Sequence, residues 1–437
     1  MINKSNLLIL GYTCPYPPSD GGKISLFATI DYLRKYINIT LVLNTNTPKD
    51  AENNQKLRAL WKEVDIKEVI NFKSVKEVAI PEKITFTKRI LSYLERKLTK
   101  PPTKKANTNP TNSARPASYL FPFSLKSENY INTIESILNE KKIDFIQIEY
   151  TPYLNLINYI STKNIISIYV EIESRNKVIK DYFDNKDLKF SDAYKNYVLE
   201  NIIYFEQQLM SRFDAIFALN ELDQEELSNA LLSTKVYNCP FPIIDNTIND
   251  FVNDDIDFMP EKLVFLGSSN HYPNIDALIW FVEDILPKLS SEIKLYVTGN
   301  WENDLKIRLA SEQVIFTGFL DSIHALLLNS ILIVPIRLGG GGIRAKILEA
   351  MAFGIPIVST RIAAPGKTLY KNGENILFGD SASEFADQIT KLLNNNALCI
   401  DLIKNANKMI KENFTQKVCG DIRLEIYQQL LNEKNNG

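Results

Sequence analysis

The sequence predicts an α/β protein made of two doubly wound domains with parallel sheets. The chain has 437 residues, which exceeds the size of one typical domain. Short apolar runs alternate with amphipathic stretches along most of the chain, as they do in βαβ units. These runs fall into two sets on either side of a segment rich in Asn, Asp and Pro, so we expect one domain on each side of it.

The first domain is predicted over residues 1–242. Leu26, Ile30, Leu33 and Ile37 recur at the spacing of one helix face between the first two apolar runs, which predicts a crossover helix. The strands of this domain are predicted at 7–10, 39–43, 145–148, 165–170 and 215–219.

A linker is predicted over residues 243–260, the second domain over 261–413, and a closing helix over 414–437 that packs back toward the first domain. The linker contains Asp255 and Asp257, which we interpret as solvated charge rather than as metal ligands. The strands of the second domain are predicted at 263–266, 293–297, 314–316, 331–335, 355–358 and 376–378.

The composition excludes several classes of protein. Lys and Arg number 50 and Asp and Glu 52, a net charge of −2 that does not suit a nucleic-acid binder. Four cysteines without a C-x-x-C pair and only two histidines favour neither a disulfide framework nor a zinc site. The first apolar run is too short for a signal peptide, and no run approaches the ~18 residues of a spanning helix. The predicted location is therefore the cytoplasm.

One segment departs from the neutral balance. Residues 73–115 contain eleven basic and three acidic side chains, a local charge of +8. Within it, Phe86, Ile90, Leu94 and Leu98 lie on one face of a predicted basic helix, and residues 83–105 could contact an anionic membrane surface from the inner side. The alternative is an ordinary solvated insertion on the first domain.

The strongest chemical signal lies between residues 331 and 360. A buried strand leads into four glycines, 339–342, and then into a helix. Glycines allow close backbone approach and a helix N-terminus attracts anions, so this junction suits a diphosphate. Arg344 and Lys346 stand in the first turn, where an anionic ligand would offset the unfavourable placement of cations. The alternative is that Lys346 and Glu349 form a surface ion pair.

Other common signatures are lacking. No G-x-G-x-x-G follows the first strand, and no G-x-S-x-G elbow occurs. The sequence therefore gives no support to a dehydrogenase or a serine hydrolase.

The segment Pro335–Thr360 resembles the donor-binding segment of GT-B glycosyltransferases, in particular the family-4-like group 1 sugar transferases. Residues 15–27 resemble the first glycine loop of that family, and residues 209–223 and 263–289 resemble two further segments. The resemblance implies two Rossmann-like domains facing a cleft, a nucleotide-sugar donor, and a glycan, lipid-linked or protein acceptor. It further implies transfer with retention of configuration in the assembly of surface polysaccharide or glycoconjugate.

The resemblance also implies roles for individual residues. Arg344 and Lys346 would neutralise the leaving diphosphate, so that no metal and no cofactor is needed, and Glu349 would bind the ribose. Gly21, Gly22 and Lys23 would lie on the acceptor side. The implied donor-binding set is Gly267, Ser268, His271, Asn274, Gly299, Gly318, Phe319, Gly340, Gly341, Gly342, Ile343 and Glu349.

The sequence departs from the common family pattern at Gly341, where an acidic residue usually contacts the donor sugar. Glu173, or its neighbour Glu171, follows a buried strand and is the candidate for a catalytic base. The missing acid also leaves open a non-catalytic binding subunit, and a sugar-nucleotide epimerase on the same fold is a further alternative.

Overall fold

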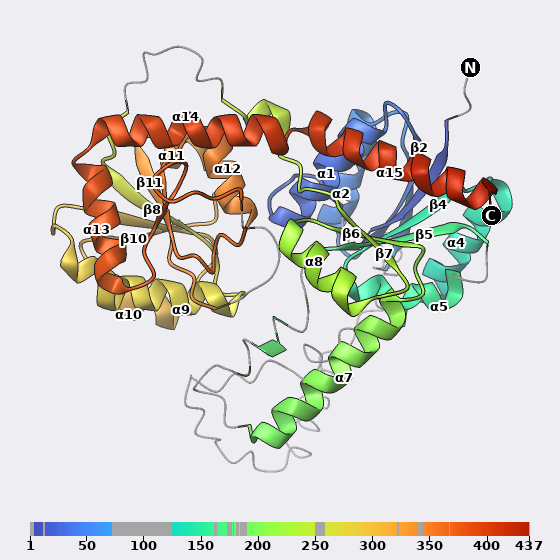
Figure 1. Ribbon diagram of the computed structural model, residues 1–437, viewed down its shortest axis with the longest axis horizontal. Coiled ribbons are helices and arrows are strands. Elements are labelled where there is room, and N and C mark those ends of the chain that lie inside the picture. The colour runs from blue at the N-terminus through green and yellow to red at the C-terminus, as the bar shows by residue number, and fades with distance from the viewer. Residues whose placement is uncertain are drawn as a thin grey trace, which may run out of the picture.

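The computed structural model describes residues 4–11, 14–71, 125–160, 164–172, 177, 179–180, 183, 190–249, 258–320, 323–338, 344–366 and 368–436. They form two parallel sheets flanked by helices, one sheet in each lobe of the molecule (Figure 1). The predicted doubly wound α/β architecture is confirmed. The basic segment 73–115 and the aspartates at 255 and 257 lie outside the described residues.

Among the described residues, the first sheet has seven strands in the order β3-β2-β1-β4-β5-β6-β7, all paired in parallel. The order reverses between β1 and β4, the kind of position at which open α/β sheets bind ligands. The strands are β1 (Asn6–Leu10), β2 (Asn38–Thr45), β3 (Asp65–Ile70), β4 (Phe145–Glu149), β5 (Ile166–Glu171), β6 (Ala215–Ala218) and β7 (Lys235–Asn238).

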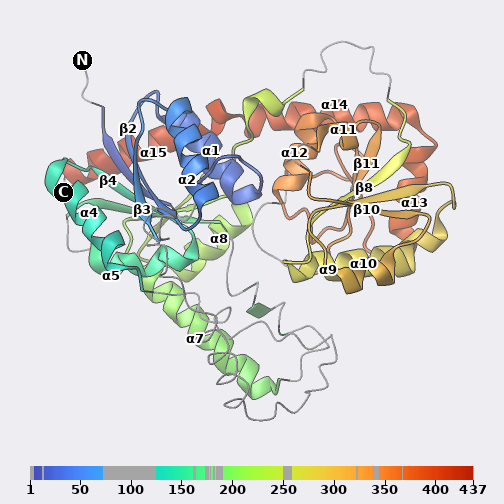
Figure 2. The same ribbon diagram turned by 180° about the vertical axis from the view of Figure 1, so that it is seen from behind.

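The helices of the first lobe begin at side-chain caps that the sequence provides. Asp20, Thr47, Ser127, Ser191 and Asn220 each accept a hydrogen bond from a backbone N–H of the first turn that follows. Helix α7 projects away from the sheet in both views (Figure 2). The helices are α1 (Gly21–Leu33), α2 (Pro48–Leu60), α4 (Glu128–Glu140), α5 (Ile157–Ile160), α7 (Asp192–Met210) and α8 (Glu221–Ala230).

The second sheet has six parallel strands in the described part of the chain, in the order β10-β9-β8-β11-β12-β13. Its order reverses between β8 and β11. The strands are β8 (Lys262–Leu266), β9 (Lys294–Thr298), β10 (Val314–Gly318), β11 (Ser330–Val334), β12 (Ile357–Ser359) and β13 (Leu377–Phe378). The helices are α9 (Tyr272–Trp280), α10 (Asn303–Leu309), α11 (His324–Leu327), α12 (Ala345–Phe353), α13 (Ala382–Leu393), α14 (Asn396–Asn413) and α15 (Gln416–Asn436).

The last two helices join the two lobes. Helix α14 packs on α12 of the second lobe, and α15 crosses over to pack on α1 of the first (Figures 1 and 2). Tyr32 of α1 donates a hydrogen bond to Asp421 of α15 at 2.5 Å, and Tyr427 of α15 hydrogen-bonds to Gln147 of β4. The chain end is therefore part of the first lobe's packing.

Not every helix or strand follows the sequence pattern. The apolar face predicted to reach Ile37 is cut short, because α1 ends at Leu33. The strands β3 and β7 were not predicted, since their residues are only partly apolar and they lie at the two edges of the first sheet. None of the described helices is long and apolar enough to cross a membrane.

Candidate functional site

Lys346 lies at the point where the strand order of the second sheet reverses. It is in the first turn of α12, and its Nζ donates hydrogen bonds to Leu266 O, the last carbonyl of β8, at 2.5 Å and to Asn274 Oδ1 at 3.3 Å. Burial and the neighbouring charge of Arg344 lower the pKa of Lys346 from 10.5 to about 7. The alternative of a Lys346–Glu349 surface ion pair is wrong, because the ammonium group points to the end of β8 instead.

The loop after β8 is arranged around Asn274. This side chain is buried and donates from Nδ2 to Ser268 O at 3.1 Å while its oxygen accepts from Lys346. A Cβ on Gly267 would lie 2.9 Å from Asn274 Cγ, so only glycine fits there. His271 caps the start of α9 through its backbone carbonyl, which accepts from the Asn274 N–H at 3.0 Å. Four of the predicted donor-binding residues thus form one connected loop.

Two further glycines stand at the neighbouring strand ends. Gly299 has a φ of +92°, and a Cβ on it would lie 2.1 Å from Gly267 O. Its N–H donates to Gly318 O at 2.8 Å, and Gly318 itself has a φ of +75°. Phe319 follows with 60% of its surface exposed. The carboxyl ends of β8, β9 and β10 are therefore joined into one glycine-lined edge, where an open parallel sheet binds ligands.

The first lobe approaches this edge at the N-terminus of α1. A Cβ on Gly21 would lie 3.0 Å from Ala345 Cβ in the first turn of α12. The two helices thus begin against each other. The Asp20 carboxylate caps the first turn of α1, whereas α12 has no side-chain cap among the described residues and presents its partial positive charge at this place. Lys23 is half-buried, with its Nζ 3.5 Å from Ser19 Oγ and 3.6 Å from Asp20 Oδ2. A diphosphate would fit the electrostatics of this junction at the N-terminus of α12, away from the Asp20 carboxylate.

Glu349 lies four residues after Ala345 on α12, hence on the same helix face. Burial and then the negative charge of Asp20 raise the pKa of Glu349 from 4.5 to about 7. Its carboxyl group has no hydrogen-bond partner among the described residues. A half-buried acid with such a pKa is typical of a ligand-binding position.

Tyr150 was not identified from the sequence, although it packs into the same junction. It follows β4, where the order of the first sheet reverses, and its φ of +74° is unusual for a residue with a side chain. A Cβ on Gly22 would lie 1.9 Å from the Tyr150 hydroxyl oxygen. Residue 22 must therefore be glycine as long as the Tyr150 side chain keeps this position. Tyr150 can be recognised only from its backbone conformation in the structure, because it belongs to no sequence motif.

The role of Glu173 as the candidate base stays a prediction. Glu173 lies outside the described residues, as do Gly340, Gly341, Gly342 and Ile343. Glu171 ends β5, is buried, and lines a cavity of about 60 Å³ with residues of the first lobe alone, among them Lys177 and Asp223, which are ion-paired at 3.0 Å. This surrounding favours a structural role for Glu171.

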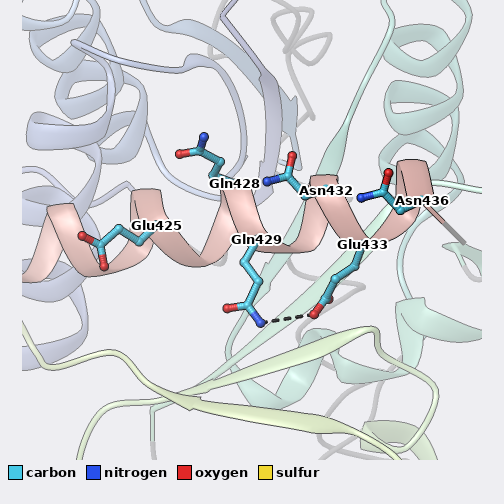
Figure 3. Close-up of a pocket in the computed structure, with 6 residues that line it drawn as sticks. All are labelled: Glu425, Gln428, Gln429, Asn432, Glu433 and Asn436. Carbon is cyan, nitrogen blue, oxygen red and sulfur yellow. Dashed lines mark hydrogen bonds between the residues drawn. The ribbon is translucent and has the colours of Figure 1, made fainter.

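Another hollow, of about 500 Å³, lies along the last turns of α15 (Figure 3). Its lining consists of polar side chains of that helix alone, with Gln429 donating to Glu433 at 3.2 Å. None of the predicted site residues lines it. The candidate site is therefore the junction between α1 and α12. Among the residues that the structure describes, no group of three His, Cys, Asp or Glu side chains could hold a metal ion.

The match to known families falls on the lobe that contains this glycine-lined edge. Residues 260–395 match the family model described as glycosyl transferases group 1. This part of the chain is therefore similar to the group 1 glycosyl transferases. Together with the fold, this match confirms the resemblance to GT-B glycosyltransferases that the sequence indicated.

Two curated proteins resemble this chain over more than half of its length. An uncharacterized 44.6 kDa protein in the cps region of Klebsiella pneumoniae is 20% identical over 427 residues, 94% of this chain and 97% of the relative. An uncharacterized glycosyltransferase of Methanocaldococcus jannaschii is 25% identical over 286 residues, 61% of this chain and 67% of the relative.

Solved structures share the fold of this chain at low sequence identity. Anabaena HepE, in complex with UDP and glucose, superimposes with a TM-score of 0.62 at 13% identity, covering 97% of this chain and 99% of that one. A Listeria monocytogenes protein described as a putative UDP-N-acetylglucosamine 2-epimerase has a TM-score of 0.50 at 11% identity, with 96% and 94% covered. The fold alone therefore does not separate sugar transfer from epimerisation.

Proposed function

We propose that this protein transfers a sugar from a nucleotide-sugar donor to a glycan, lipid-linked or protein acceptor in the assembly of surface polysaccharide. The donor binds at the second domain and the acceptor at the first. The group 1 match over residues 260–395 supports the donor side. The relative in the cps region of Klebsiella pneumoniae supports the polysaccharide context.

The observation that carries this proposal is the position of Lys346. Its ammonium group is fixed against the end of β8, where the strand order reverses, and the N-termini of α1 and α12 meet beside it. Fixed cations and helix N-termini stabilise negative charge that develops on a leaving diphosphate. Arg344 and Lys346 would do this without a metal or another cofactor.

The reaction would then proceed with retention. The bond between the anomeric carbon and the diphosphate oxygen breaks, and the acceptor oxygen bonds to the same face of that carbon. The acceptor's proton passes to the departing diphosphate, which leaves as the nucleoside diphosphate. This route explains why the described junction offers no obvious protein base, and it makes the charge of Lys346 the main contribution of the chain.

A nucleotide-release assay tests the proposal. We expect the double variant Arg344→Ala/Lys346→Ala to lose at least 100-fold in turnover, because removing one such stabilising group costs about 10²–10³. Arg308→Ala, which breaks an exposed ion pair with Glu283, is the matched control and should keep full activity. Full activity in the double variant would refute the assignment.

Two alternatives give other results in the same assay. An epimerase would convert the donor sugar with no acceptor present, and the fold it shares with the Listeria protein is the observation that favours this candidate. A non-catalytic subunit, suggested by Gly341 in place of an acid, would bind the nucleotide sugar and never consume it.

We also propose that residues 83–105 hold the protein on the anionic inner face of the membrane, which favours a lipid-linked acceptor. The support is the charge of +8 over residues 73–115 and the apolar spacing within them. Deleting residues 83–105 should reduce binding to vesicles that contain phosphatidylglycerol and leave UDP-sugar binding intact. Unchanged vesicle binding would favour the solvated insertion.

A further inference from the structure

The contact between α1 and α12 places an acidic residue of the first domain beside the donor site. Gly21 lies over Ala345, with 3.0 Å between Ala345 Cβ and a Cβ built on Gly21. Asp20 precedes Gly21 directly, and Glu349 lies four residues beyond Ala345 on the same helix face. Asp20 and Glu349 are therefore brought together from different domains.

The Asp20 carboxylate retains free capacity to accept hydrogen bonds. Its Oδ1 caps α1 by accepting from the Lys23 N–H at 3.1 Å, and its Oδ2 is 3.6 Å from Lys23 Nζ. The side chain is nevertheless 59% exposed. Its charge is close enough to raise the pKa of Glu349, so the two acids share one electrostatic environment.

A carboxylate in this position selects the kind of group that it can bind. It accepts hydrogen bonds and cannot donate them when ionised, so it repels a diphosphate and attracts hydroxyl groups. A nucleotide sugar offers hydroxyl groups on its ribose and on its transferred sugar. By the resemblance, Glu349 takes the ribose, which leaves the transferred sugar for Asp20.

The resemblance to that family implies a further reason to look for such a group. In the family that the chain resembles, an acidic residue eight positions before Glu349 contacts the donor sugar, and here that position is Gly341. A glycine offers no carboxylate, so the contact must come from elsewhere or be lost.

We propose that Asp20 accepts a hydrogen bond from a hydroxyl of the donor's transferred sugar, and so supplies from the first domain the acidic contact that position 341 does not. This inference rests on the proposed function. It makes Asp20 a specificity-determining residue and requires a donor sugar with a free hydroxyl toward α1. It also means that the sugar, unlike the nucleotide, is held by both domains.

The test compares binding of a nucleotide with binding of its sugar conjugate. The probes are UDP with UDP-glucose, GDP with GDP-mannose, and ADP with ADP-glucose, measured by calorimetry and in the nucleotide-release assay. Asp20→Ser keeps a good helix cap, but it removes the negative charge and shortens the side chain. We expect it to bind the free nucleotide within twofold of the wild type and to lose at least tenfold in kcat/KM for the conjugate. Asp20→Asn keeps a neutral hydrogen-bond acceptor, so its kcat/KM for the conjugate should lie between those of the wild type and Asp20→Ser.

A matched control separates capping from sugar recognition. Thr47→Ala removes the equivalent cap of α2, which lies elsewhere in the first domain, and should lower the melting temperature without changing KM for the donor. The monodeoxy analogues of the preferred sugar identify the hydroxyl. One analogue should be a poor substrate for the wild type and no poorer than the parent sugar for Asp20→Ser.

The outcomes distinguish the two proposals. If Asp20→Ser is as active as the wild type, or weakens the free nucleotide as much as the conjugate, the role of Asp20 in sugar recognition is refuted. If the wild type neither binds nor consumes any of the three conjugates, the proposed function fails first. Additive losses with all four deoxy analogues would also overturn the assignment.

Discussion

Lys346 and Glu349 differ in charge, yet both titrate near neutral pH. Burial and Arg344 lower the pKa of Lys346 to about 7, and burial and Asp20 raise the pKa of Glu349 to about 7. Neither shift helps folding, because each reports a charge that the folded protein holds unfavourably. We interpret this as a stability cost kept for binding, with the diphosphate and the ribose hydroxyls as the missing partners.

Replacing Glu349 with Gln should therefore stabilise the ligand-free protein above pH 7. The pKa of Glu349 is about 7 when folded and 4.5 in its ordinary state, so the folded form binds the extra proton between these values and stability falls as pH rises through them. Each pKa unit corresponds to about 1.4 kcal/mol, so we expect a gain of order 1–3 kcal/mol above pH 7 that disappears below pH 4.5.

Urea unfolding of both proteins at pH 4, 6 and 8 measures this gain. The same variant should bind the donor nucleotide more weakly. A gain that is equal at pH 4 and pH 8 would contradict the assignment to ionisation of Glu349.

Gly22 gives a second prediction at the scale of one residue. An added methyl group would lie 1.9 Å from the Tyr150 hydroxyl oxygen and 2.8 Å from its Cζ. Gly22→Ala should push Tyr150 out of place, lower transfer at least tenfold and cost about 1–3 kcal/mol of stability. Tyr150→Leu in the same chain should restore most of the stability, which chemical unfolding measures. A single variant as stable as the wild type would show that Tyr150 moves freely.

Some residues of this site could be predicted from the sequence around them, and others only from the folded structure. Lys346 and Glu349 belong to the local motif after the four glycines, and the glycines at the strand ends were implied by the family resemblance; the structure places Gly267, Gly299 and Gly318 along one edge. Asp20 and Tyr150 act through contacts between distant segments, to α12 and to Gly22 respectively. No spacing in the sequence records such contacts, because they depend on how the two domains meet.

At the scale of helices and strands, predictability follows burial. The central strands β1, β4 and β11 are buried along nearly all of their length. In the sequence, β1 and β11 appear as continuous apolar runs, and β4 as an apolar run interrupted by Gln147. In the edge strands β3 and β7, apolar and polar residues are mixed over a short span, so their hydrophobic pattern is weak. Helix α15 has a polar sequence and is placed by its contacts with α1, which sequence periodicity describes poorly.

The packing of α15 on α1 can be tested at Gly420. A Cβ there would lie 2.0 Å from Tyr32 Cδ1, although Ala is otherwise about 1 kcal/mol better than Gly in a helix. Gly420→Ala should therefore destabilise the protein by about 1–3 kcal/mol instead of stabilising it. Lys417→Ala, on the exposed side of the same helix, is the control. Thermal unfolding of both variants measures this change in stability. A Gly420→Ala variant more stable than the wild type would mean that α15 packs loosely on α1.

At the scale of the whole molecule, the chain crosses between the two domains twice, and this crossing fixes the position of one domain relative to the other. The first passage lies near Ile243 and the second near Thr415, and the two pair as a parallel bridge. Gln416 holds this crossing together: its N–H donates to Asp245 Oδ1 at 2.8 Å, and its Nε2 donates to Ala28 O of α1 at 3.1 Å. The Gln416 side chain thus connects both passages to the helix that carries Asp20 and Gly22 at its start.

Gln416→Ala should separate donor binding from transfer. The variant leaves the Asp245 N–H and Ala28 O without their buried partner, which costs about 1–3 kcal/mol. The residues proposed to bind the nucleotide lie in the second domain, so UDP affinity should stay within twofold of the wild type. Transfer requires α1 to be held against α12, so kcat should fall at least fivefold.

Gln313→Ala is the matched control for this change. Its amide also donates two hydrogen bonds, to Ser290 O and Ile293 O, but both partners lie within the second domain. We expect it to leave kcat unchanged. Equal losses in the two variants would attribute the effect to general destabilisation, whereas a loss confined to Gln416→Ala would show that the crossing sets the geometry in which Asp20 and Lys346 act on one donor.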